Sequence, residues 1–136
     1  METKSSAYRL LFREAPPETY AVMPPEQREQ LLQRWNNWAD GLVAQGKMRH
    51  GHPLEPQGLT ISGARGQHIV DGPFAETKEA IGGYFYLEGV DLAEATAIAR
   101  QCPQLQHGMV IELRPVAGAC HLAHSLGRQT MKVEAV

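Results

Sequence analysis

The residues best suited to chemistry in this sequence are one aspartate and two histidines. Asp71 stands directly before Gly72-Pro73, and His50 and His52 alternate earlier in the chain. Histidine titrates near neutral pH, and a carboxylate beside it can accept or deliver a proton, so such a pair suits general acid–base catalysis. We therefore predict Asp71 as a proton-transfer residue, with His50 or His52 as its catalytic partner.

Each of these residues also has a structural interpretation. An aspartate before Gly-Pro can accept hydrogen bonds from backbone amides in an Asx turn. The turn role and the catalytic role of Asp71 stay evenly balanced on the sequence alone. His50 and His52 would point to one side of an extended segment, where they could bind a metal. A metal site needs further ligands, and Asp71 is the one further ligand that the sequence suggests. An exposed loop without a metal is the favoured setting for both histidines.

Two other groups contain residue types that occur in functional sites, but their spacing favours a structural role. Cys120, His121 and His124 are metal-binding types, yet no second Cys or His pair lies at a matching distance, so we interpret them as part of a flexible or dimer-contacting tail. Trp35 and Trp38 could line a pocket for an aromatic ligand. Because they recur with apolar neighbours on one helical face, we place them in the core.

Short apolar runs and two longer amphipathic stretches define the elements that must position these residues. Strands are expected at residues 7–12, 59–61, 68–70, 83–87 and 109–113, and helices between Pro25 and Gly46 and from Leu92 to Pro103. Asp91 with Glu94 three residues later predicts a capped start for the second helix. Residues 47–56 are expected to be irregular, and residues 63–66 to connect a hairpin.

This order predicts an α+β domain with a ferredoxin-like antiparallel sheet and both helices on one face. Alternation along the clearest strand puts Tyr84 and Tyr86 on one side and Phe85 and Leu87 on the other. Both faces of the sheet therefore carry large side chains, and the face without helices needs a cover. We expect a homodimer that buries this second face.

Composition excludes several classes of function. The chain has 136 residues and a formal charge of −2, without the basic face that nucleic-acid binding needs. No apolar stretch approaches a membrane span, and the first residues lack the apolar core of a secretory signal. With Cys102 and Cys120 expected as reduced thiols, we predict a cytoplasmic protein. The P-loop, the dinucleotide fingerprint, the Gly-x-Ser-x-Gly elbow and the Cys-x-x-Cys pair are all missing, so we expect no cofactor.

The segment around Asp71 resembles a known family. The quoted runs are Asp71-Gly72-Pro73-Phe74-Ala75-Glu76-Thr77-Lys78-Glu79, Ile81-Gly82-Gly83-Tyr84-Phe85, Asp91-Leu92-Ala93-Glu94-Ala95, Cys102-Pro103 and Ile111-Glu112-Leu113-Arg114-Pro115-Val116. They are similar to the DGPF proteins of the YCII-related family. The resemblance covers roughly residues 7–116, so we expect a domain over residues 1–116 and a tail over residues 117–136.

What the resemblance implies is a dimeric α+β barrel, in which two ferredoxin-like sheets pack face to face. Some relatives are credited with a His–Asp pair, and Asp71 matches the aspartate. Because they belong to the matched run, Phe74, Glu76 and Lys78 are expected to bind the ligand. The superfamily includes isomerases, lyases, cofactor-free monooxygenases and proteins that only bind ligands, so the fold alone selects no reaction.

Three functions remain on these grounds. The first is a cofactor-independent lyase or isomerase that acts on a small organic molecule through Asp71. The second is a non-catalytic ligand-binding or regulatory accessory protein with the same pocket. The third is a protein-interaction module that uses the dimer surface and the tail. A perturbed carboxyl group beside a deep apolar cavity would favour the first.

Overall fold

The structure is a computed structural model that describes residues 6–72 and 80–128. Six strands and four α-helices follow one another along these residues. In chain order they are β1 (Ala7–Arg13), α1 (Pro17–Ala21), α2 (Pro25–Ala44), β2 (Met48–Pro53), β3 (Leu59–Ser62), β4 (His68–Asp71), β5 (Gly83–Glu88), α3 (Leu92–Ala99), β6 (Val110–Pro115) and α4 (His121–Ser125), with short 3₁₀ turns at Ala64–Gly66 and Pro103–His107.

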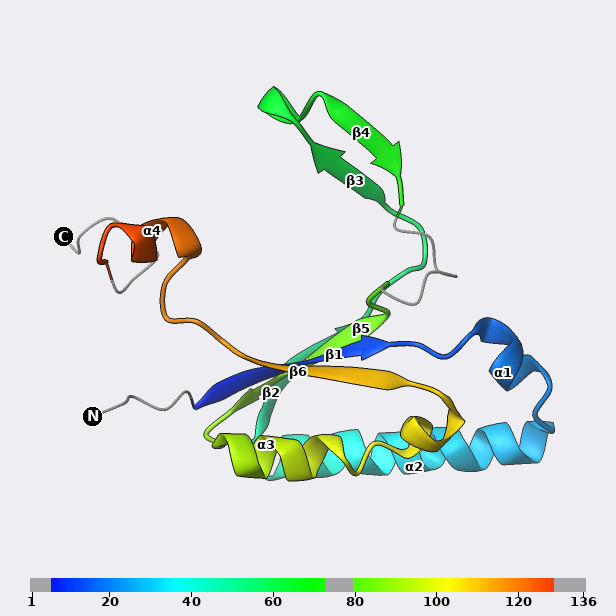
Figure 1. Cartoon of the computed structure of the whole chain (residues 1–136). Coiled ribbons are helices and arrows are strands. Elements are labelled where there is room, and N and C mark those ends of the chain that lie inside the picture. The colour runs from blue at the N-terminus through cyan, green and yellow to red at the C-terminus, as the bar shows by residue number, and fades with distance from the viewer. Residues whose placement is uncertain (1–5, 73–79, 129–136) are drawn as a thin grey trace.

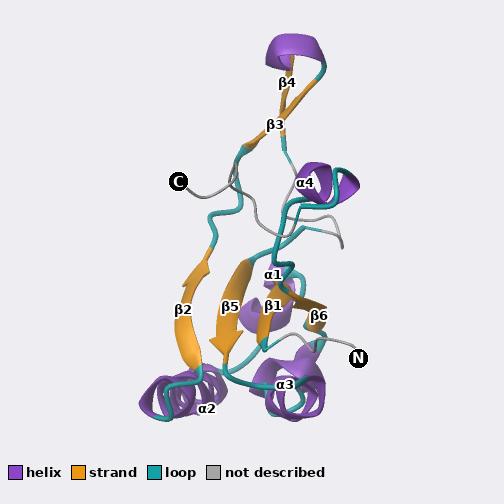
Figure 2. Cartoon of the chain, turned by 90° about the vertical axis from the view of Figure 1, so that its left-hand side faces the viewer, coloured by secondary structure: helices purple, strands orange, loops and turns teal. Residues whose placement is uncertain are grey.

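Four of the strands form one antiparallel sheet in the order β2-β5-β1-β6. Helices α2 and α3 lie side by side on one face of this sheet, as the two views in Figure 1 and Figure 2 show. This order and this layering are those of a ferredoxin-like α+β fold, which confirms the predicted fold class.

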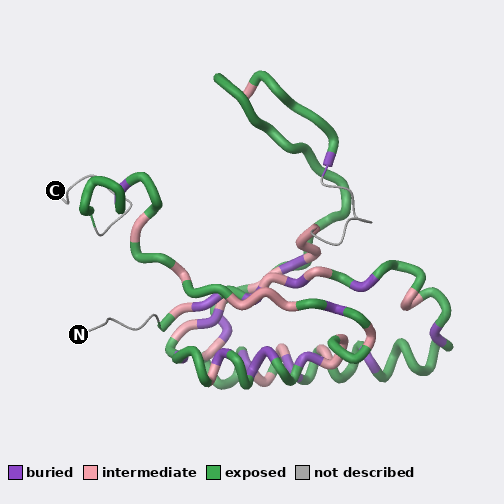
Figure 3. Tube along the Cα trace, in the orientation of Figure 1, coloured by how far each residue is buried: buried purple, intermediate pink, exposed green. Residues whose placement is uncertain are grey.

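The core lies between the sheet and the two helices (Figure 3). Tyr8, Leu10 and Phe12 alternate along β1 with more exposed residues and all point to the helical side, because successive strand residues face opposite ways. The Phe12 ring lies 5.2 Å from Trp35, 6.3 Å from Trp38 and 4.9 Å from Phe85, measured between centroids. The predicted core role of both tryptophans is confirmed, with Trp38 buried and Trp35 partly buried.

The ends of the two long helices follow the residues that predicted them. Gly46 has a φ of +73° after α2, and the amides of Gly46 and Lys47 donate to the carbonyls of Val43 and Leu42, which closes the last turn. At the start of α3 the Glu94 amide donates to the Asp91 side chain at 2.8 Å. The Glu94 side chain pairs with Lys47 instead of returning to the cap, so the cap is one half of a capping box.

The structure corrects the prediction for residues 47–56, which are not irregular throughout. Residues 48–53 form the edge strand β2, which pairs with β5 and carries an irregularity of register between Met48 and His50. An edge strand tolerates Pro53 because the missing amide faces away from the ladder. Gly51 is required here, because a Cβ at this position would lie 2.6 Å from Phe85 Cδ1 and 2.8 Å from the Tyr84 carbonyl oxygen.

The second helix and the hairpin also differ from the sequence prediction. Helix α3 ends at Ala99 rather than beside Pro103, and Leu92 in its first turn is 57% exposed. The predicted strands at residues 59–61 and 68–70 exist, but they form a separate two-stranded sheet, β3 with β4, outside the main one. Figure 1 shows this hairpin standing away from the sheet on the side opposite the helices.

The face of the sheet without helices is open in the described part of the chain. Tyr84 and Tyr86 lie on it, and Phe85 and Leu87 are buried beneath, as the alternation predicts. The short helix α4, which sequence patterns missed, lies on the same side as the hairpin (Figure 1). Its start is capped by the Cys120 sulfur, which accepts the Ala123 amide at 3.3 Å. Among the described residues, no helix is long and apolar enough to cross a membrane.

Candidate functional site

The two histidines lie on the open face of the sheet, on strand β2. His50 Nδ1 lies 3.3 Å from the Tyr84 hydroxyl oxygen, and the His50 ring stacks on Tyr86 with centroids 4.9 Å apart and an interplanar angle of 12°. The Arg9 guanidinium lies over the Tyr84 and Tyr86 rings, 4.8 and 5.6 Å from their centroids. His50 and His52 are both exposed, as expected, but on a strand rather than in a loop.

Asp71 lies elsewhere, at the end of β4 and at the root of the hairpin. It pairs with Leu59 across the two-stranded sheet, and its side chain is exposed. The amide of Gly72 then donates to the Gly58 carbonyl at 2.9 Å, which closes this end of the hairpin. No hydrogen bond or ion pair joins Asp71 to either histidine within the chain as described. The predicted ligand-binding residues Phe74, Glu76 and Lys78 lie outside the described residues.

Two adjoining cavities open at the end of the sheet where the hairpin departs. The larger, here called the outer chamber, has a volume of about 690 Å³ and lies against the root of the hairpin. It is lined by Glu14, Ala15, Pro17, Pro53, Leu54, Glu55, Pro56, Gln57, Gly58, Leu59, Gly72, Ala80, Ile81 and Gly82. Gly72 brings the segment next to Asp71 to its wall. A concave, mostly apolar space with few polar groups is typical of a small-molecule site.

The smaller cavity, the inner chamber, has a volume of about 260 Å³ and lies between the sheet and α2. It is lined by Phe12, Glu14, Trp35, Ala39, Met48, Gly51, His52, Pro53, Gly82, Gly83, Tyr84 and Phe85. Glu14, Pro53 and Gly82 belong to both linings, so the chambers meet at these three residues. His52 is among the lining residues of the inner chamber, and His50 lines neither chamber.

Glu14 is the acidic group at this junction. It follows the last residue of β1, and its side chain crosses the backbone of Gly82 so closely that a Cβ there would lie 2.3 Å from Glu14 Cγ. Gly82 is itself fixed, because its amide donates to the Phe12 carbonyl at 2.7 Å and its carbonyl accepts from Leu54 at 2.9 Å. Glu14 is exposed as a residue, yet the surrounding protein partly desolvates the carboxyl and raises its pKa above the usual value.

Two further titratable groups lie within electrostatic reach of Glu14. Burial raises the pKa of Tyr20 to about 12, and the nearby charges of Glu14 and Cys102 add to the shift. Burial likewise raises the pKa of the Cys102 thiol to about 11, partly offset by hydrogen bonds from the backbone at Gln104 and Leu105. The Tyr20 hydroxyl is buried and has no hydrogen-bond partner among the described residues. This end of the molecule therefore disfavours negative charge.

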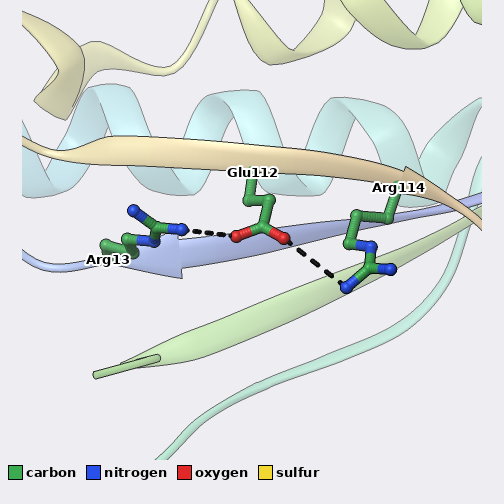
Figure 4. A network of polar contacts seen from close by, with 3 residues as sticks. All are labelled: Arg13, Glu112 and Arg114. Atoms are coloured by element: carbon green, nitrogen blue, oxygen red, sulfur yellow. Dashed lines mark hydrogen bonds and ion pairs between the residues drawn. The ribbon is translucent and has the colours of Figure 1, made fainter. Parts of the chain in front are cut away.

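The open face carries a second polar arrangement, which involves three residues on β1 and β6 (Figure 4). Arg13 Nη2 donates to Glu112 Oε2 at 2.6 Å, and Arg114 Nη1 lies 3.6 Å from Glu112 Oε1. Arg114 and Glu112 thus pair along the same strand face, and Arg13 joins them from the neighbouring strand. All three side chains are about one-third exposed or more, so each pair adds little to stability.

Sequence patterns did not single out Glu14. The one available signal is its place directly after the first strand and before Ala15-Pro16-Pro17, where the chain must leave the sheet. Residues that could hold a metal are not grouped in threes within residues 6–72 and 80–128. Cys102 and Cys120 are both free thiols, as predicted.

Taken together, the sheet order, the two helices on one face and the paired chambers define a ferredoxin-like domain with a cavity of ligand size. The sequence model of the YCII-related domain matches residues 8–117. The chain therefore belongs to the YCII-related family. No protein with a curated description matches this sequence.

Proposed function

We propose that this protein is a cofactor-independent enzyme of the lyase or isomerase type that moves a proton on a small organic molecule. The observation that carries the proposal is the placement of Glu14, a carboxyl group with a raised pKa at the junction of two largely apolar chambers. A raised pKa makes the carboxylate a stronger base and brings its titration closer to neutral pH, where a general acid–base group works best.

In this proposal Glu14 takes the first proton-transfer role, and the walls around it limit competing water. His52, whose side chain lies on the open face, is also among the residues that line the inner chamber, and it is the histidine we propose as the partner of Glu14. Asp71 stays a candidate for the second proton transfer, since its neighbour Gly72 lines the outer chamber. Phe74, Glu76 and Lys78 stay proposed ligand-binding residues on the strength of the family resemblance.

The test is solvent deuterium exchange into candidate substrates. A panel of small ketones, lactones and enol ethers is incubated with the protein in deuterated buffer, and exchange of the C–H bonds is followed by NMR. Protein-dependent exchange is expected for at least one chemical class, because the proton that a carboxylate removes is replaced from solvent.

Two variants decide which residue is responsible. Exchange is expected to be lost in Glu14→Gln and kept in Glu29→Gln, the same change at an exposed position of α2 that lines neither chamber. Asp71→Asn is expected to melt at the wild-type temperature, because the side chain is exposed, while slowing exchange if it shares the chemistry. Exchange that survives in Glu14→Gln would contradict the proposal.

The alternative function is non-catalytic binding of a small ligand, with a regulatory or accessory role. One observation favours it: Asp71 is exposed and belongs to a strand ladder, a setting in which an aspartate needs no catalytic role. A molecule that binds tightly in the chambers and shows no exchange by wild-type protein would select this alternative.

The family resemblance and the open sheet face together support a homodimer, which we propose as the working form in the cytoplasm. Sedimentation velocity is expected to show a dimer. Tyr86→Lys is expected to weaken it, since the change adds a charge beside Arg9 in the centre of the open face, and Leu32→Lys on exposed α2 is expected to have no effect. A monomer at all concentrations of wild-type protein would refute the dimer.

A further inference from the structure

Among the described lining residues of the chambers, the acidic side chains have no lysine or arginine beside them. Glu14 and Glu55 lie on the outer chamber, and the described lining of both chambers includes neither lysine nor arginine. The remaining outer wall is largely proline, leucine, isoleucine, alanine and glycine, with one amide from Gln57. Low-dielectric walls strengthen the field of an acidic group inside a cleft, so such a space repels anions and attracts cations.

The inner chamber has an aromatic wall beside the one carboxylate, Glu14, that it shares with the outer chamber. Its lining includes the aromatic residues Phe12, Trp35 and Phe85, which belong to the core on the helical side of the sheet. The rings of Phe12, Trp35 and Phe85 contact one another edge-to-face or tilted, at centroid distances of 4.9 to 5.3 Å, which gives the chamber a closely packed aromatic wall. Such a wall suits an aromatic or alicyclic body, and a nearby cation gains from the ring faces.

Three cationic side chains of the neighbouring elements interact with groups outside the chambers. Arg9 lies over the tyrosine rings of the open face, Arg13 pairs with Glu112, and Lys47 pairs with Glu94 beside α3. None of these three lines either chamber. The described lining therefore offers a carboxylate or phosphate no lysine or arginine, so such a ligand would lose hydration there without gaining either charge as a partner.

We propose that the site takes a hydrophobic amine: a small molecule with a ring or branched apolar body and one ammonium group. The body fills the inner aromatic chamber, and the ammonium group lies in the outer chamber against Glu55. The bond between them then passes Glu14 at the junction. This inference concerns the ligand of the site used by the proposed function, and it rests on the same pair of chambers.

The test compares three probes of one shape and different charge by isothermal titration calorimetry at neutral pH and low salt. Phenethylamine is cationic, phenethyl alcohol is neutral and hydrocinnamate is anionic. Phenethylamine is expected to bind about tenfold more tightly than hydrocinnamate or better, since one favourable and one unfavourable charge interaction separate them. Glu55→Gln is expected to shrink this preference several-fold, and Glu29→Gln to leave it unchanged.

Each result decides the inference. Hydrocinnamate binding as tightly as phenethylamine, no binding of phenethylamine, or a full preference in Glu55→Gln would overturn it. The proposed reaction fails separately: a charge preference without any deuterium exchange would leave the amine site standing and remove the enzyme. Exchange in neutral or anionic molecules without a preference for the amine would support the enzyme and refute the amine site.

Discussion

Phe12→Ala is expected to lower the free energy of unfolding by about 3–5 kcal/mol, the range for truncating a buried aromatic residue. Phe12 is among the largest fully buried side chains of the described core, and its ring contacts those of Trp35, Trp38 and Phe85. These three rings are carried by α2 and β5, so they cannot fill the space left by Phe12 without a shift of these elements. Small domains have only about 5–15 kcal/mol of stability in total, so the variant is expected to be partly unfolded on warming.

Chemical denaturation followed by tryptophan fluorescence measures this effect, because both tryptophans border the missing ring. Leu32→Ala provides the control, since Leu32 is 58% exposed on α2 and its loss is expected to cost no more than about 0.5 kcal/mol. A cost for Phe12→Ala within this same small range would mean that the aromatic cluster is not the centre of the core.

Glu14→Gln is expected to reduce the rate of the proposed proton transfer by about a hundredfold to ten-thousandfold, the usual contribution of a general acid or base. The amide keeps the size of the side chain but cannot accept the proton. The wild-type rate is expected to rise with pH through a pKa above the ordinary glutamate value, because burial raises that of Glu14. The variant is expected to lose this inflection, and a retained inflection would assign the base to another residue.

The same substitution has an opposite effect on stability, which provides an internal control. Because the pKa of Glu14 is higher in the folded state, the folded protein binds more protons than the unfolded chain between the ordinary and the raised value. Wild-type stability therefore falls as pH rises through this window. Glu14→Gln lacks the titration, so it is expected to match the wild type in acid and to be at least as stable at neutral pH. A melting temperature well below wild type at neutral pH would show instead a structural role for Glu14.

Much of the fold follows from patterns of short range. The alternation at Tyr84 to Leu87, the glycine after α2 and the aspartate before α3 each specify their own backbone, and all three occur as predicted. Strand β2 was missed because its residues lack the usual apolar alternation. It exists through its partner: β5 supplies the ladder, and Gly51 leaves the space that Phe85 fills. Pairing with a distant strand leaves little trace in the amino-acid sequence of the strand itself.

The site was harder to predict than the fold, for a similar reason. His52 is among the lining residues of one cavity and Gly72, next to Asp71, lines the other, so two of the predicted segments lie beside the cavities of the proposed site. Glu14 escaped notice because nothing in its neighbours marks it. Its pKa is raised by burial, to which residues far along the chain such as Gly82 contribute by packing against its side chain.

The hairpin β3–β4 leaves the sheet next to Pro53, and the chain re-enters the sheet at Gly83, which is paired with Pro53. The four-stranded sheet is therefore complete without the hairpin. We call the sheet with its helices the frame, and the residues between Pro53 and Gly83 the insertion. Leu54, Pro56, Leu59 and Gly72, which line the outer chamber, all belong to this insertion, whereas the aromatic core belongs to the frame. Mutations in the insertion can alter which molecules enter without weakening the frame. Ligand specificity can therefore change through the hairpin, while stability depends on the sheet and its helices. The hairpin is the natural place to graft or randomise sequence in directed evolution.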